Sequence, residues 1–121
     1  RLGPERLRRF FSKGTGSNAG KARIRPEVAA MVKFSQLNLL DRHWSVKEPV
    51  DAIFCRNVMI YFDKPTQKAV LERFAPLLKP GGLLFAGHSE NASLVNQAFR
   101  PLGQTIYSLG AQSVQRQAVA A

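Results

Sequence analysis

A nearly continuous apolar run, Val50-Asp51-Ala52-Ile53-Phe54-Cys55, ends abruptly in the polar pair Arg56-Asn57. Such a run is typical of a strand that is covered on both faces in a parallel sheet. A helix-start signal follows at Asp63-Lys64-Pro65-Thr66, and apolar residues then recur every three or four positions, which predicts a helix over residues 65–78. A second buried strand is expected over residues 83–86. Strand, helix and strand in this order predict an α/β fold with parallel pairing.

The pattern continues on both sides of this segment. After residue 86 we expect a helix over residues 89–98, a last strand over residues 104–109 and a flexible tail over residues 110–121. Residues 1–36 predict the end of a helix and a small basic β-ribbon, in which two short runs flank a glycine-rich turn; a short helix and a third strand over residues 32–37 follow. We therefore divide the chain into residues 1–36, 37–109 and 110–121.

Composition restricts the class of protein. The 121 residues contain 18 Lys and Arg against 8 Asp and Glu, a net charge of +10, with 45% hydrophobic residues and one Cys. No apolar run approaches the ~20 residues that a membrane-spanning helix needs, and the basic start of the chain lacks the apolar part of a secretory signal. One Cys makes no internal disulfide, so we expect a cytoplasmic protein without membrane insertion.

The positive charge is concentrated at the start of the chain. Residues 1–33 hold nine of the basic residues and two acidic ones. Such a segment attracts nucleic acid, anionic lipid or an acidic protein surface, or is simply a solvated basic face, and both interpretations stay open here. Few aromatic residues lie between these cations to stack on bases.

Polar clusters follow the predicted strands. Ligands of open parallel sheets bind beyond the carboxyl ends of the strands, and there the sequence has Arg56-Asn57 with Tyr61, and Gly87-His88-Ser89-Glu90-Asn91. A third cluster, Leu37-Asn38-Leu39-Leu40-Asp41, combines an amide that could read the edge of an adenine with leucines that would cover its face.

Each cluster also has a purely structural interpretation. Arg56 and Asn57 could form a strand-end ion pair and a turn, His88 could lie at the edge of the core, and Asn38 could cap a helix. Cys55, His43 and His88 lack the spacing of metal ligands, so we expect no metal site. A nucleophilic pair of Cys55 and His88 is disfavoured, because burial at the end of an apolar strand makes a thiol unreactive.

The segment from Asp51 to Phe62, DAIFCRNVMIYF, resembles the hallmark of the chemotaxis receptor methyltransferases, the CheR family. Residues 77–85, LLKPGGLLF, resemble S-adenosylmethionine-dependent methyltransferases in general, and residues 87–91 and 104–107 again resemble this family. The resemblance runs from about residue 5 to residue 109. It implies the C-terminal part of a Rossmann-like class I methyltransferase fold with a small antiparallel β-subdomain.

The resemblance also implies an activity. A methyl group passes from S-adenosylmethionine to glutamate side chains on the cytoplasmic helices of chemoreceptors, which forms glutamate methyl esters in chemotaxis adaptation. By similarity, Asn38 and Leu39 contact the adenine end of the cofactor, and Arg56 and Asn57 lie beside its ribose and methionine portion. Tyr61 faces the methyl-transfer site, so Tyr61 and Arg56 are the expected catalytic residues.

The basic ribbon resembles the β-subdomain that captures the C-terminal tail peptide of a receptor in this family. The residues that carry this expectation are cations and glycines of the turn, namely Lys13, Gly14, Gly16, Gly20 and Arg23. An exposed strand edge pairs with an added peptide strand, and the cations attract an acidic peptide. The alternative is an ordinary hairpin loop with solvated cations.

The chain departs from the family pattern because the family's front half, with its glycine-rich cofactor turn and acidic cofactor ligands, is absent from these 121 residues. We therefore expect about half of a cofactor site and weak or no activity of this chain alone. Two competing hypotheses are a module that only binds the receptor tail and a basic α/β domain that binds nucleic acid; the family resemblance favours an enzyme that does not bind nucleic acid.

Overall fold

The computed structural model describes residues 1–47, 49–87 and 98–110. The chain divides into two compact units, Arg1–Gln36 and Leu37–Ala121, which we describe one at a time.

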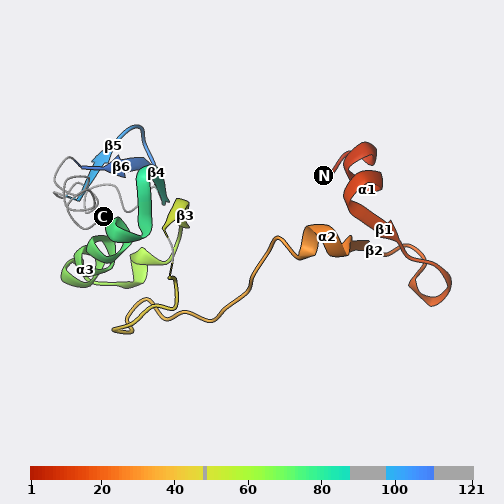
Figure 1. The fold of residues 1–121 in the computed structure, drawn as a ribbon, viewed down its shortest axis with the longest axis horizontal. Coiled ribbons are helices and arrows are strands. Elements are labelled where there is room, and N and C mark those ends of the chain that lie inside the picture. Colours follow the sequence, from red (N-terminus) through yellow and green to blue (C-terminus); the bar gives the residue numbers. More distant parts are fainter. Residues whose placement is uncertain (48, 88–97, 111–121) are drawn as a thin grey trace. The chain divides into compact units, whose positions relative to one another are not determined.

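The first unit is a ribbon between two short helices. Helix α1 (Pro4–Phe10) runs directly into strand β1 (Phe11–Lys13), which pairs antiparallel with β2 (Ala22–Ile24), and helix α2 (Pro26–Ala29) follows (Figure 1). The single turn η1 (Gly16–Asn18) lies in the loop between the strands. The predicted ribbon and short helix are confirmed, and the residues expected at the end of a helix form a short helix that begins at Pro4.

The predicted third strand is wrong. Residues 32–38 form no helix or strand, and the side chain of Phe34 is 93% exposed. The alternation of apolar and polar residues was the only signal for this strand. Alternation does not make a strand without a neighbouring strand to accept and donate its backbone hydrogen bonds.

The second unit is a mixed sheet with a helix packed on one face. Its strands are β3 (Val50–Cys55), β4 (Leu78–Ala86), β5 (Phe99–Pro101) and β6 (Ile106–Leu109), in the order β3-β4-β6-β5. Strands β3 and β4 are parallel, which confirms the prediction, and the other two pairs are antiparallel. Helix α3 (Lys64–Phe74) and the turns η2 (Met59–Tyr61) and η3 (Ala75–Leu77) connect β3 to β4 (Figure 1).

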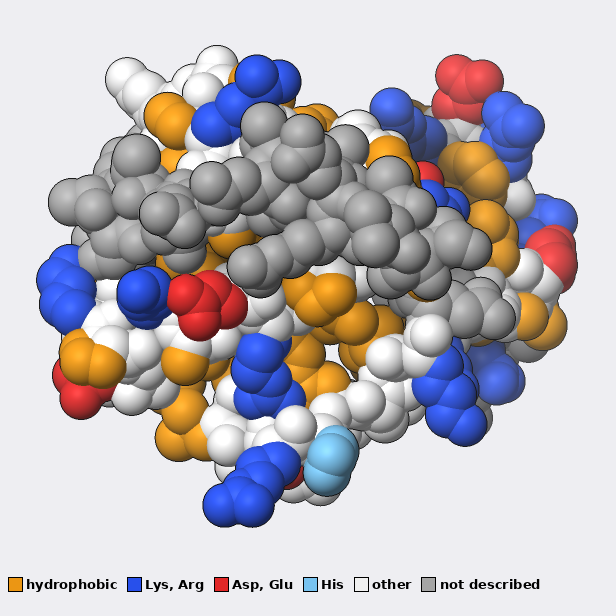
Figure 2. All heavy atoms as spheres, turned by 60° about the vertical axis from the view of Figure 1, so that its left-hand side comes forward, with side chains coloured by type: hydrophobic (Ala, Val, Ile, Leu, Met, Phe, Trp, Pro, Cys, Tyr) orange, Lys and Arg blue, Asp and Glu red, His pale blue; other side chains and the backbone are white. Residues whose placement is uncertain are grey.

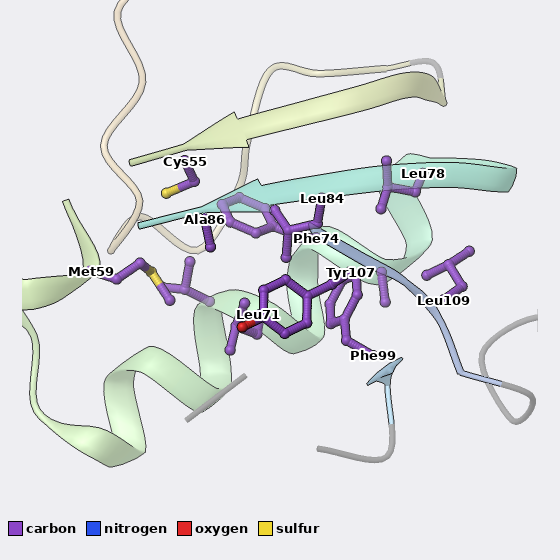
Figure 3. Packing of buried hydrophobic residues seen from close by; sticks show 12 residues of the cluster. Cys55, Met59, Leu71, Phe74, Leu78, Leu84, Ala86, Phe99, Tyr107 and Leu109 are labelled. Atoms are coloured by element: carbon purple, nitrogen blue, oxygen red, sulfur yellow. The ribbon is translucent and has the colours of Figure 1, made fainter. Parts of the chain in front are cut away.

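The core lies between this sheet and helix α3. Leu84 of β4 is fully buried and pairs in register with Tyr107 of β6, while Leu71 and Phe74 come from the helix. Figure 3 shows these four side chains converging in one cluster below the sheet, with Met59 at its edge. Every second residue of β4 from Gly82 onward is buried, as the period of two in a strand requires.

Two expectations about this unit need correction. Among the described residues, strand β3 is not covered on both faces, because it lies at the edge of the sheet and helix α3 covers only the face of Ile53 and Cys55. On the other face, the Phe54 ring stacks on Phe85 at 4.4 Å between centroids and remains 72% exposed. Strand β4 also begins earlier than predicted, at Leu78, and its pairing with β3 shifts register after Val50.

The end of the sheet was only partly predicted. The expected last strand is confirmed as β6, whereas the short strand β5 was not predicted at all. The helix expected over residues 89–98 and the tail expected from residue 110 lie almost wholly outside the described residues.

Candidate functional site

Strands β3 and β4 end at the same edge of the sheet. Cys55, the last residue of β3, pairs in register with Ala86, the last residue of β4. Arg56 and Asn57 follow β3 at this edge, and both are exposed. Gly87 follows β4 and is buried, whereas His88 and the rest of that predicted polar cluster lie outside the described residues.

Asn57 turns the chain sharply as it leaves β3. Its φ of 60° is positive, in the left-handed region, and no other described residue except glycine has a positive φ. Asparagine tolerates this conformation better than most residues do. Within the described part of the chain, Arg56 makes no ion pair, so the interpretation of Arg56 as half of a strand-end ion pair finds no partner there.

Tyr61 lies on turn η2, close behind this pair in sequence. Its side chain is 79% exposed, whereas Met59 on the same turn is 1% exposed and anchors the turn in the core. The exposed residues Arg56, Asn57 and Tyr61 therefore belong to one short loop whose interior side is fixed by burial.

A glutamine side chain of helix α3 holds this loop. Gln67 Nε2 donates to the carbonyl oxygens of Met59 and Phe62, both at 2.9 Å, and Gln67 is the one buried polar side chain among the described residues. Gln67 was not among the residues predicted from the sequence. Its position was a usable signal, because Gln67 lies three and four residues before Val70 and Leu71, on the apolar face of the helix.

The Asn38 side chain closes a turn over residues 38–41. Its Oδ1 accepts from the backbone N–H of Leu40 at 3.0 Å, and its Nδ2 donates to Asp41 Oδ1 at 3.1 Å. The alternative of a helix cap is wrong, because no helix follows. An amide carries two N–H groups and two lone pairs on its oxygen, so one of each remains for a ligand, and asparagine pairs in this way with the edge of adenine.

An open cleft of about 340 Å³ lies between this turn and helix α3. Leu39 and Leu40 form one wall, and the helix contributes a wall made of Pro65, Thr66, Ala69, Val70 and Arg73. Apolar walls with a few polar groups suit a flat heteroaromatic ring such as adenine. The residues present therefore fit the adenine end of S-adenosylmethionine, and helix α3 contacts both the 38–41 turn and the loop after β3.

The ribbon residues expected to bind a peptide occupy two faces. Lys13 pairs with Ala22, and Arg23 pairs with Ser12, so Lys13 and Arg23 lie on opposite faces of the ribbon, and both are exposed. The structure therefore does not bring these two cations to one face.

The three glycines Gly14, Gly16 and Gly20 of the turn are required for different structural reasons. A Cβ at Gly14 would lie 2.0 Å from the carbonyl oxygen of Asn18, so its missing side chain makes room for the chain's own backbone. Gly16 and Gly20 have positive φ values of 56° and 82° and open space where a side chain would be. Only these two glycines leave room for another backbone to approach.

The remaining candidates for chemistry are few. Hydrogen bonds from Thr66 lower the pKa of Asp63, which caps helix α3. The Cys55 side chain is buried, as expected.

The described residues contain no group of three His, Cys, Asp or Glu side chains that could hold a metal ion. None of the helices in the described ranges is long and apolar enough to cross a membrane.

Comparisons with known proteins match most of this chain. The family model described as "CheR methyltransferase, SAM binding domain", where SAM is S-adenosylmethionine, matches residues 1–108. A chemotaxis protein methyltransferase of Klebsiella aerogenes is 59% identical over 108 residues, which are 89% of this chain and 37% of that protein. The chemotaxis protein methyltransferase of Escherichia coli is 56% identical, over 89% of this chain and 38% of the relative.

A third relative, chemotaxis protein methyltransferase 2 of Pseudomonas aeruginosa, is 58% identical over 84% of this chain and 36% of its own length. The chain thus spans under two-fifths of the length of these relatives. The matching family is a class I methyltransferase family with S-adenosylmethionine as its methyl donor. With a family model that matches residues 1–108, this chain belongs to the CheR methyltransferase family.

Proposed function

We propose that the protein containing this chain is a protein-glutamate O-methyltransferase of the bacterial cytoplasm. It transfers a methyl group from S-adenosylmethionine to glutamate side chains on chemoreceptor cytoplasmic helices, in chemotaxis adaptation. The observation that carries this proposal is the short exposed loop with Arg56, Asn57 and Tyr61 at the common carboxyl end of β3 and β4. In a Rossmann-like sheet, this edge is where ligands bind.

The cofactor contacts follow from the two segments beside helix α3. Asn38 and Leu39 hold the adenine end, since the free N–H and lone pair of the Asn38 amide match an adenine edge and Leu39 supplies an apolar wall. Arg56 and Asn57 hold the ribose and methionine portion from the end of β3.

The chemistry makes few demands on acid–base groups. S-adenosylmethionine supplies an electrophilic methyl group on a sulfonium sulfur. A glutamate carboxylate, with a pKa of about 4.3, is already ionised at neutral pH and is the nucleophile without a general base. What the protein must supply is the in-line placement of carboxylate oxygen, methyl carbon and sulfur, together with exclusion of water.

Arg56 and Tyr61 supply that placement. The Arg56 guanidinium attracts and orients the substrate carboxylate, and the Tyr61 hydroxyl donates a hydrogen bond to it. Both contacts are exposed and therefore weak, which suits the reaction, because tight binding of the nucleophile stabilises the ground state and slows the transfer.

A second role is supported by a different observation. The ribbon pairs only two strands of three residues each, so in the described part of the chain each strand has an edge without a partner strand. We propose that a receptor tail peptide adds as a further strand to one of these two edges. Arg23 is its main cationic contact on one face of the ribbon, and Lys13 is its cationic contact on the other. The loop glycines Gly16 and Gly20 admit the peptide backbone, whereas Gly14 keeps the loop closed.

The test is methyl transfer by the complete protein to a purified receptor cytoplasmic fragment, with label carried on the donor methyl group. We expect base-labile label on glutamate, and for Tyr61→Phe we expect kcat to fall about tenfold with little change in KM for the donor. Arg23→Ala serves as the matched comparison, since it should weaken tail-peptide binding and leave donor affinity unchanged. Label on nucleic acid, or label on protein that base does not release, would overturn the proposal.

A further inference from the structure

The side chain of Arg73 joins helix α3 to residues 37–47, a stretch whose described residues form no helix or strand. Its Nη1 donates to the carbonyl oxygen of Leu39 at 3.2 Å, and its Nη2 donates to that of Arg42 at 3.1 Å. Its guanidinium carbon lies 3.9 Å from the centroid of the Trp44 ring. One side chain therefore contacts three residues of this stretch at once.

These contacts require an arginine. Two nitrogens of one planar guanidinium reach two carbonyl oxygens while its face covers an indole ring, and a lysine ammonium has neither the fork nor the flat face. The indole Nε1 of Trp44 is buried and has no hydrogen-bond partner in the described part of the chain. Trp44 is therefore held by its ring contacts, with Arg73 and with Phe74 at 5.3 Å between centroids.

The internal hydrogen bonds of the 38–41 turn define its conformation, but they do not define its position relative to helix α3. The hydrogen bonds that its own groups donate come from the Leu40 and Asp41 N–H groups and from the Asn38 amide, and all of these end within the turn. Within the described residues, the turn is attached to the rest of the unit by the packing of the half-buried Leu39 against the core and by the bond from Arg73 to the Leu39 carbonyl. Only the second of these is directional.

We infer that Arg73 is a positioning residue for cofactor binding, which sets the distance and angle between the 38–41 turn and helix α3 and so shapes the adenine end of the site. This inference rests on the proposed cofactor role of Asn38 and Leu39. Two of the guanidinium nitrogens are engaged with backbone carbonyls, so Arg73 acts through the turn.

The test compares Arg73→Met and Arg73→Lys with the native residue in the complete protein. We expect Arg73→Met to raise both the Kd and the KM for S-adenosylmethionine about tenfold, because a charged hydrogen-bonding group that orders the turn is lost. The kcat at saturating donor should stay within about twofold, because the reacting atoms are not touched. Arg73→Lys should recover little of the lost affinity.

Two controls lie on the same helix. Lys68→Met also removes a positive charge, from an exposed pair with Glu72 at 3.8 Å, and should leave donor affinity unchanged. Leu71→Val lowers Tm through the core without contacting the turn, and it should also leave donor affinity unchanged. A loss of affinity in Leu71→Val as large as in Arg73→Met would mean that general destabilisation causes the effect, and it would overturn the inference.

The variant Asn38→Ala distinguishes the positioning role of Arg73 from the proposed cofactor role of the 38–41 turn. If Asn38→Ala weakens donor binding and Arg73→Met does not, the turn binds the cofactor and the role of Arg73 is refuted. If neither variant changes the Kd, the cofactor role of the turn is refuted, and the role of Arg73 with it.

Discussion

The two units of this chain are built by different forces. Residues 1–36 contain no buried side chain in their helices, and they are held by the backbone pairing of β1 and β2 and by Arg25, which donates to the Arg8 carbonyl oxygen at 2.9 Å. Among its described residues, the second unit has a core of twelve buried apolar residues. On the face drawn in Figure 2, basic and apolar side chains both lie at the surface. Hydrogen bonds hold the first unit together, whereas burial of apolar side chains holds the second.

The largest expected effect follows from this difference. Leu84→Ala removes a fully buried side chain from the centre of the sheet and should lower the free energy of unfolding by about 2–5 kcal/mol. Ile24→Ala in the ribbon should cost less than about 1 kcal/mol, because Ile24 is already 40% exposed. Urea unfolding of the complete protein, with hydrogen exchange to follow each unit, measures both. An equal loss of unfolding free energy in Leu84→Ala and Ile24→Ala would contradict the view that burial stabilises mainly the second unit.

The same difference explains how far the sequence predicts the fold. Strand β3 was predicted from its apolar run and helix α3 from the three-to-four spacing of its apolar residues, because burial leaves such patterns in the sequence. The ribbon was predicted because its turn needs glycines. The alternation over residues 32–37 failed because a strand depends on a partner that no local pattern specifies. Strand β5 was missed because its three residues, Phe99–Pro101, are too few to show a period.

The candidate site was predicted unevenly for a related reason. Arg56, Asn57 and Tyr61 were expected at a strand end, and the structure places Arg56 and Asn57 at the carboxyl end of β3 and Tyr61 on the loop that follows. Gln67 and Arg73 were not expected, because each donates to backbone carbonyl oxygens. Any residue type offers such an oxygen, so the sequence does not mark the partner. A polar residue on the apolar face of a helix was the one signal available, and it applied to Gln67 alone.

The next largest effect is a loss of peptide binding by the ribbon of the first unit. Gly14→Ala places a Cβ at 2.0 Å from the Asn18 carbonyl oxygen, so the loop between β1 and β2 must open. We expect tail-peptide binding to fall about tenfold or more while donor affinity stays unchanged, since a strand edge binds only when it is preformed. Calorimetric titration with the peptide and the donor measures both. The matched control is Gly3→Ala, where a Cβ meets nothing within 4 Å; a loss of peptide binding in that variant as well would refute the role of loop closure.

The smallest effect concerns how helices begin in the two units. Asp63 caps α3 by accepting from the Thr66 backbone N–H at 2.9 Å, whereas Gly3 and Arg25, at the starts of α1 and α2, make no side-chain cap. The Thr66 hydrogen bonds hold the pKa of Asp63 below its ordinary value of 3.8, so the unfolded chain takes up the proton more readily than the folded chain. The cap's charge-dependent stabilisation is therefore complete above the ordinary carboxyl pKa and is lost as pH falls through the lowered one.

Asp63→Asn keeps a capping oxygen that does not titrate, which makes it the matched variant for this prediction. Near neutral pH, Asp63→Ala should have a Tm a few degrees below that of the native protein, with Asp63→Asn between them. As pH falls below about 4, the native protein should lose its advantage over Asp63→Ala, while Asp63→Asn keeps its own. A native advantage that persists unchanged in acid would mean that the neutral hydrogen bond, and not the ionised carboxylate, supplies the cap, and α3 would then begin with as little dependence on charge as α1 and α2.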